Sequence, residues 1–144
     1  MPNKALRIII ADTEHYHRMK LERLLNHRGY FCIAPVGSLE EFLTLVEYGS
    51  KPFDLILANA DLASGSLDLT GFLRGNLQVR HSMIYNAPQA LLESVPVAHP
   101  SCLQMTAVQL PDSAVLERLM TLIDPEANES AQPWLYACRR GLGS

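Results

Sequence analysis

Oxygen-bearing side chains stand directly after several short apolar runs of the chain. Asp12, Thr13 and Glu14 follow the first run, and Asn59 and Asp61 follow another. Carboxylate and amide oxygens are ligands for hard cations such as Mg²⁺, so Asp12 with Asp61 is a weak candidate cation site. An acid at the end of a strand more often caps the next helix or faces water, and we favour that capping role for Asp12.

Other catalytic or cofactor-binding patterns are missing from the sequence. His15 and His17 are two residues apart, which places them on different sides of a helix rather than in a chelating i, i+4 pair. Three widely spaced cysteines form no C-x-x-C motif, and the residues after Ala11 lack the glycines of a phosphate-binding loop. The sequence therefore predicts a non-enzymatic protein without a cofactor or a structural metal.

Alternating strand and helix signals run along the chain. The predicted strands are Leu6–Ala11, Tyr30–Ala34, Asp54–Ala58, Met83–Tyr85 and Leu103–Val108. The predicted helices are Glu14–Arg28, one that starts after Ser38, Leu67–Arg74, one opened by Pro88, and one capped by Asp112. Ser38 and Glu41 have the spacing of a capping box.

Five strand–helix units in succession favour an open, doubly wound α/β fold, with a parallel sheet and helices on both faces. In such sheets a site lies beyond the carboxyl ends of the strands, where the strand order reverses. Candidate residues therefore also follow the two later strands, namely Asn86, Ala87, Gln109, Leu110 and Pro111.

Composition narrows the function further. The 144 residues are 48% hydrophobic and 19% charged, with a net charge of -3, so the chain lacks the positive field that nucleic acid requires. No apolar run is long enough to span a membrane, and the first residues lack the apolar core of a signal peptide. We expect a soluble, cytoplasmic protein that binds neither membranes nor, by itself, nucleic acid.

The chain resembles the receiver (CheY-like) domain of two-component response regulators over about residues 5 to 124. The similarity rests on four segments, which are Ile8–Glu14, Phe53–Asn59, Met83–Ala87 and Leu110–Pro111. They correspond to the family's acidic pair, its phosphorylated aspartate, its Thr/Ser-Ala pair and its Lys-Pro pair. The resemblance implies the flavodoxin-like strand order 2-1-3-4-5, with residues 1–124 as the domain and 125–144 as a tail or connector.

Three departures from the family pattern argue against phosphorylation. Asn59 stands at the phosphoacceptor position, and an amide is a poor nucleophile. Thr13 replaces one acid of the metal-binding pair, and Leu110 replaces the lysine that would neutralise phosphoryl oxygens. The resemblance is therefore to a degenerate receiver, or pseudo-receiver, that acts in signalling by binding proteins. Its vestigial pocket would comprise Asp12, Thr13, Glu14, Asp61, Asn86, Leu110 and Pro111.

Two alternatives remain at this stage. Asp61 could serve as a phosphoacceptor together with Asp12, although it stands two residues after the matching position. The former phosphorylation pocket, lined by Asn59, Asn86 and Asp12, could instead hold a small molecule.

The resemblance also predicts a contact surface. In the family, the face made by the fourth helix, fifth strand and fifth helix carries partner or dimer contacts. The corresponding apolar residues here are Leu91, Leu92, Val95, Met105, Leu116 and Met120. We expect a homodimer, with a signalling kinase or an output protein as a further partner. The only tryptophan, Trp134, lies in the tail, which either folds back on the domain or docks elsewhere.

Overall fold

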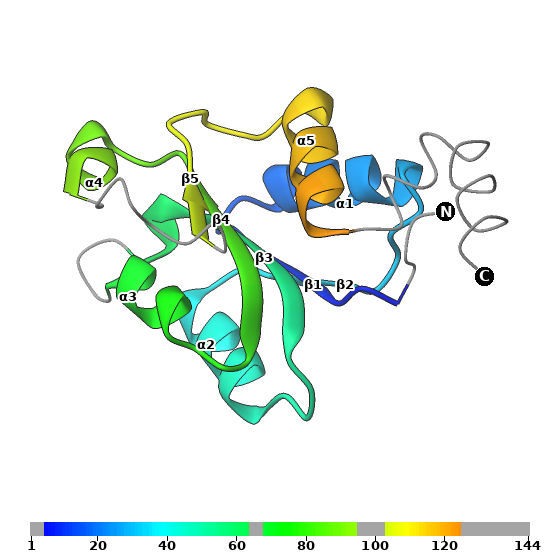
Figure 1. Cartoon of the computed structure of the whole chain (residues 1–144), viewed down its shortest axis with the longest axis horizontal. Coiled ribbons are helices and arrows are strands. Elements are labelled where there is room, and N and C mark those ends of the chain that lie inside the picture. Colours follow the sequence, from blue (N-terminus) through cyan, green and yellow to red (C-terminus); the bar gives the residue numbers. More distant parts are fainter. Residues whose placement is uncertain (1–4, 64–67, 95–102, 125–144) are drawn as a thin grey trace, which may run out of the picture.

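The computed structural model describes residues 5–63, 68–94 and 103–124. Within these residues, five parallel strands form one sheet in the order β2-β1-β3-β4-β5 (Figure 1). The strands are β1 (Ile8–Ala11), β2 (Ile33–Val36), β3 (Phe53–Asn59), β4 (Val79–Tyr85) and β5 (Leu103–Met105). The predicted fold class and strand order are confirmed.

Helices cover both faces of the sheet, as Figure 1 shows. They are α1 (His15–His27), α2 (Leu39–Tyr48), α3 (Leu69–Arg74), α4 (Gln89–Ser94) and α5 (Ser113–Ile123), with the short 3₁₀ helix η1 (Ala60–Ala63). No helix in the described ranges has the length and apolar character needed to cross a membrane.

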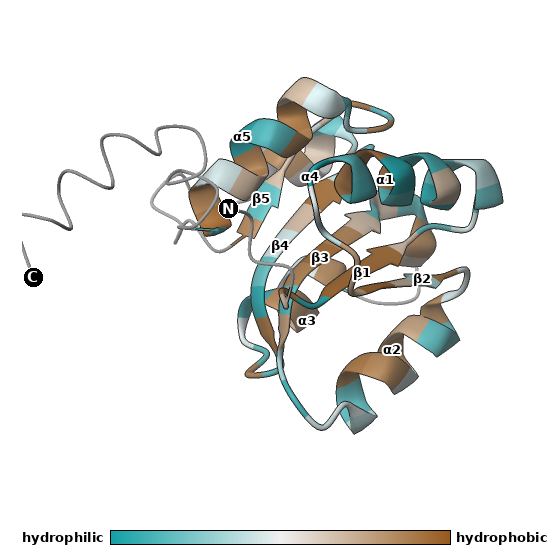
Figure 2. Ribbon diagram, turned by 90° about the vertical axis from the view of Figure 1, so that its right-hand side faces the viewer, coloured by the Kyte–Doolittle hydropathy of each residue, from teal (hydrophilic) through white to brown (hydrophobic). Residues whose placement is uncertain are grey.

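The sheet separates two apolar cores, and alternate residues of each strand enter opposite ones. Ile9 and Ile56 pack in the core that α2 and α3 cover, whereas Ile8 and Ile10 pack in the core that α1 and α5 cover. Strand β1 is buried on both faces and is therefore apolar at every position (Figure 2). Each buried aliphatic side chain stabilises the fold by about 1.5–3 kcal/mol, so this central strand anchors the domain.

The predicted helix starts are confirmed at two caps. The Ser38 hydroxyl accepts a hydrogen bond from the Glu41 amide at 3.1 Å, and the Asp112 carboxylate accepts one from the Val115 amide at 2.9 Å. Each cap satisfies an amide that has no partner within the first helical turn, which explains why the helices begin where they do.

Three predicted strand boundaries are wrong. Strand β2 starts at Ile33 rather than Tyr30, because the Tyr30 side chain is buried against α5 and the chain reaches the sheet only later. Strand β4 starts at Val79, which pairs with Phe53, so pairing recruits residues that lack a strong strand pattern. Strand β5 ends at Met105, three residues earlier than predicted.

The predicted contact surface needs a correction. Leu116 and Met120 are buried in the core between α5 and the sheet, so they cannot contact a partner. Their spacing along α5 reflects packing against the sheet. Leu92 and Met105 are half-buried against the other core. Val95, Leu67, Trp134 and the tail 125–144 lie outside the described residues, as does the side chain of Leu91.

Candidate functional site

A fully buried carboxylate marks the carboxyl edge of the sheet. Asp12 follows β1 directly and has no solvent exposure. Its Oδ2 atom accepts hydrogen bonds from the Tyr85 hydroxyl at 2.6 Å and from the Asn59 Nδ2 at 3.1 Å, and it lies 3.0 Å from the His17 Nδ1. Its Oδ1 atom accepts a bond from the Glu14 amide at 2.9 Å. Both carboxylate oxygens are therefore engaged from inside the protein.

Strand order brings these side chains together. Strand β3 lies between β1 and β4, with Ala11 paired to Ala58 and Asn59 paired to Tyr85. Asp12 follows Ala11, and Asn59 follows Ala58. Asp12 and Asn59 therefore lie beside each other at the ends of two neighbouring strands. Parallel strands end at the same edge of a sheet, which is why residues far apart in the sequence converge here.

Hydrogen bonding keeps the Asp12 carboxylate charged. Burial alone would raise its pKa, but hydrogen bonds from Tyr85, the Glu14 amide, Asn59 and His17 together lower the pKa below the ordinary value of 3.8. Burial, and next the hydrogen bond to Asp12, raise the pKa of the Tyr85 phenol. Tyr85 therefore remains protonated and donates a hydrogen bond to the charged Asp12 carboxylate.

A second layer of the network reaches the surface. The Asn59 Oδ1 accepts hydrogen bonds from the Asp61 amide at 2.9 Å and from the Asn86 Nδ2 at 3.2 Å. The same Asn86 Nδ2 donates to the exposed Asp61 carboxylate at 3.0 Å. Asn86 has a φ of 56°, in the left-handed region that asparagine tolerates better than most residues. In this backbone conformation the side-chain amide of Asn86 lies between Asn59 and Asp61 and bonds to both.

The other residues of the predicted pocket contribute less. Thr13 and Glu14 are exposed, and only the backbone amide of Glu14 bonds to Asp12. Leu110 is half-buried against the core beneath α1 and α5, and Pro111 is buried. The structure thus joins Asp12, Asn59, Asn86 and Asp61 directly.

The predicted capping role of Asp12 is wrong. Glu14 occupies the N-cap position of α1, and its own side chain forms no capping hydrogen bond. The carboxylate of Asp12 instead turns inward, because Tyr85 and Asn59 offer it two donors in the protein interior. Its bond to the Glu14 amide is a local turn that leads into the helix.

Three residues of the site are not among those that the sequence predicts for it. They are His17, Arg18 and Tyr85. The Arg18 guanidinium donates to the Asp12 carbonyl oxygen. A signal for Tyr85 was its phenol, since a tyrosine at the end of a buried strand needs a polar partner. His17 and Arg18 stand a little more than one helical turn after Asp12, which also places them near this edge.

Hydrogen bonds join the polar side chains of this arrangement. In residues 5–63, 68–94 and 103–124, no three His, Cys, Asp or Glu side chains stand close enough to hold a metal ion together. The amide of Asn59 already donates to one carboxylate and accepts from two donors. The result is a hydrogen-bonded polar cluster at the ends of β1, β3 and β4, next to α1.

Comparisons with known proteins inform the fold. No family model matches the chain, and no curated protein matches it either. One similar solved structure is described as the yeast Spc42 trimeric coiled coil, amino acids 181–211, fused to another structure. The two chains are 21% identical, the match covers 99% of this chain and 95% of the other, and the TM-score is 0.59. At this identity the likeness shows a shared fold alone.

Proposed function

We propose that the protein is a phosphorylation-independent, receiver-like signalling or adaptor module of a two-component-type pathway, and that it acts by binding other proteins. One observation carries the proposal. The Asn59 amide stands at the end of β3 and donates to the buried Asp12 carboxylate at 3.1 Å. An aspartate in its place would remove that donor and set two carboxylates against each other.

Phosphoryl transfer would also need positive charge near the acceptor. Leu110, at the position where the resemblance places a lysine, packs half-buried against apolar core residues. It has no donor for a phosphoryl oxygen, whose developing charge must be stabilised for transfer to proceed. Both the acceptor position and the charge-neutralising position therefore favour recognition of the folded domain over a chemical switch.

Incubation with Mg²⁺ and a small acyl phosphate, followed by intact mass spectrometry, tests the proposal. We expect no phosphoryl mass on the natural chain. The Asp61→Asn variant should behave identically, which makes it the matched control for the exposed acid. A phosphoryl group on the natural chain that disappears in Asp61→Asn would overturn the proposal.

That outcome would support the second candidate, in which Asp61 is a phosphoacceptor. One observation favours it, because Asp61 is exposed and its carboxylate reaches Asn59 indirectly through Asn86. An attacking donor can approach an exposed carboxylate, whereas the buried Asp12 is shielded.

The proposed module would also contact a partner or a second copy through α4, β5 and α5. With Leu116 and Met120 assigned to the core, the large apolar side chains exposed on the described part of this face are Val108, which follows β5, and Leu122 of α5. Light scattering after size exclusion at several concentrations tests dimerisation. We expect a concentration-dependent dimer that Leu122→Arg shifts towards monomer. A monomer at every concentration would remove this part of the proposal.

A further inference from the structure

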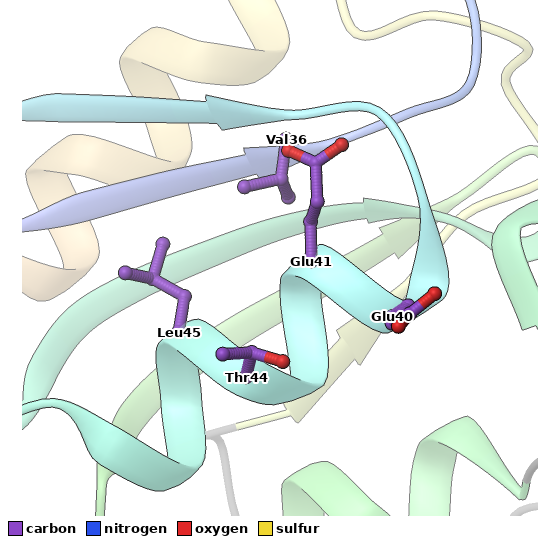
Figure 3. A pocket seen from close by; sticks show the side chains of 5 residues that line it. All are labelled: Val36, Glu40, Glu41, Thr44 and Leu45. Carbon is purple, nitrogen blue, oxygen red and sulfur yellow. The ribbon is translucent and has the colours of Figure 1, made fainter.

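A groove lies at the open edge of the sheet, between α1, β2 and α2, and Arg18 joins it to the Asp12 site. It consists of two adjoining hollows of about 390 and 270 Å³ that share Glu41 as a lining residue. The larger hollow is lined by Val36, Glu40, Glu41, Thr44 and Leu45, and Figure 3 shows Glu41 and Leu45 pointing from α2 towards β2. The smaller is lined by His15, Arg18, Met19, Glu22, Pro35, Gly37 and Glu41.

The lining combines apolar surface with negative charge. Carboxylates come from Glu22, Glu40 and Glu41, and none of them forms an ion pair within the described part of the chain. The lining also contains the cation Arg18, whose guanidinium donates to the neutral Asp12 carbonyl oxygen and lies 3.4 Å from the His15 ring. The groove thus presents three carboxylates to one guanidinium, beside apolar side chains.

Gly37 leaves room for the guanidinium of Arg18. A Cβ atom there would lie 3.0 Å from the Arg18 Nη1, so a larger residue would require the guanidinium to shift. With Gly37, the guanidinium passes close to the end of β2 and reaches the Asp12 carbonyl oxygen. Because that carbonyl is neutral, the charge of Arg18 remains at the groove, where the three carboxylates outnumber it.

The open edge of β2 does not suit the addition of a further strand. The Cys32 and Val36 carbonyls bond to β1, so the backbone groups of Pro35 point away from the sheet. Because proline has no N–H to donate, Pro35 weakens the pairing of a further strand with this edge. A partner must therefore recognise this groove through side chains.

We infer that the groove between α1, β2 and α2 docks a basic, amphipathic helical segment of a partner protein. Lysine or arginine side chains of that segment would face Glu22, Glu40 and Glu41, and its apolar side chains would cover Val36, Leu45 and Met19. This inference rests on the proposed function, because it names the chemistry of the protein that an adaptor would bind.

A short synthetic helical peptide of leucine and arginine is the probe, titrated into the isotope-labelled full chain and followed by amide NMR. Two matched peptides carry glutamate in place of arginine, or serine in place of leucine. We expect the leucine–arginine peptide to shift amides of α1, β2 and α2, with weaker binding at higher salt, and the two matched peptides to bind at least about tenfold more weakly.

Charge variants locate the binding site on the protein. Glu41→Lys should weaken binding of the leucine–arginine peptide about five- to tenfold, since an attraction becomes a repulsion. Thr44→Glu adds a carboxylate to the groove and should tighten binding, a gain that misfolding cannot mimic. Glu47→Lys makes the same charge change on α2 outside the groove lining and should leave binding nearly unchanged.

Several results would overturn the inference. They are the absence of binding, equal binding of the serine peptide, amide shifts centred elsewhere, or an equal loss with Glu47→Lys. Uptake of a phosphoryl group would defeat the proposed function without moving these titrations, so the two failures are distinguishable.

Discussion

Two buried aspartates in this domain each accept a hydrogen bond from a buried tyrosine, at opposite ends of the fold. Asp12 bonds to the Tyr85 hydroxyl and Asp124 to the Tyr30 hydroxyl, both at 2.6 Å. Asp12 follows a strand at the carboxyl edge of the sheet. Asp124 follows α5, and its amide bonds to the Met120 carbonyl at the end of that helix.

The surroundings of the two pairs give them different roles. Asp12 also takes donors from α1 and β3, and Asn59 extends its network to the exposed Asp61. The pair of Tyr30 and Asp124 ties the turn after α1 to the end of α5. The pair of Tyr30 and Asp124 therefore connects α1 to α5, whereas the pair of Tyr85 and Asp12 belongs to a larger polar network. The difference follows from the position of Asp12 at the end of a strand.

The largest expected effect comes from Asp12→Ala. Removing this carboxylate leaves the Tyr85 hydroxyl and the Asn59 amide buried without their acceptor, so we expect the free energy of unfolding to fall by about 3–5 kcal/mol. Urea denaturation measures the change. The exposed acid Asp61 is the control, and Asp61→Ala should cost less than about 1 kcal/mol. Equal losses would show that the Asp12 network does not stabilise the domain.

Asn59→Asp should be the next most disruptive change. It places a second carboxylate within about hydrogen-bonding distance of Asp12, which at neutral pH should destabilise the fold by about 2–3 kcal/mol. One of the two carboxyl groups would then have a raised pKa in the folded state. The loss should therefore shrink as the pH falls through that pKa, and added Mg²⁺ should also restore stability.

Chemical denaturation of Asn59→Asp at several pH values, with and without Mg²⁺, measures both effects. The isosteric amide at Asp12, in the double variant Asp12→Asn with Asn59→Asp, is the control because only one carboxylate remains. A loss that is the same at every pH would contradict the charge-repulsion explanation.

Replacing each tyrosine by phenylalanine compares the two pairs directly. Tyr85→Phe and Tyr30→Phe should each cost about 1.5–3 kcal/mol, the usual contribution of a hydrogen bond to a charged group. The pKa of Asp12 is lowered from 3.8 in the fold, so its ionisation stabilises the protein above that pH, and the stabilisation is lost as the pH falls through the folded-state pKa. Tyr85→Phe should weaken this loss in acid.

Thermal or chemical unfolding over the acidic range tests the difference. Tyr30→Phe leaves every donor to Asp12 in place. The stability that this variant loses in acid should therefore still include the contribution of Asp12. If both variants changed the acid dependence equally, the assignment of that dependence to Asp12 would be wrong.

The smallest effect is expected for His17→Ala. The His17 side chain is 29% exposed, so water can replace part of its interaction with Asp12, and we expect a loss of about 0.5–1 kcal/mol. Denaturation at neutral pH measures it, with His27→Ala, an exposed histidine of the same helix, as the control. A loss larger than that of Tyr85→Phe would make His17 rather than Tyr85 the main donor.

Much of the fold was predictable because local signals agree with it. The apolar run at Ile8–Ala11, the Ser38 cap and the Asp112 cap each specify an element through their immediate neighbours. The sequence predicts strand β4 too short because Val79 and His81 join the sheet by pairing with Phe53 and Leu55 of β3. It misplaces Leu116 and Met120 because an apolar stripe has the same spacing whether it packs on a sheet or on a partner.

The order of strands and helices, and the positions of Asp12, Asn59 and Asn86 at strand ends, can be read from the sequence because side-chain periodicity and helix caps are local properties. The donors around Asp12, the contact of Arg18 with Asp12 past Gly37, and the excess of acids along the edge of β2 appear only in the folded chain. Those features depend on residues far apart in the chain meeting at set distances, which periodicity does not encode.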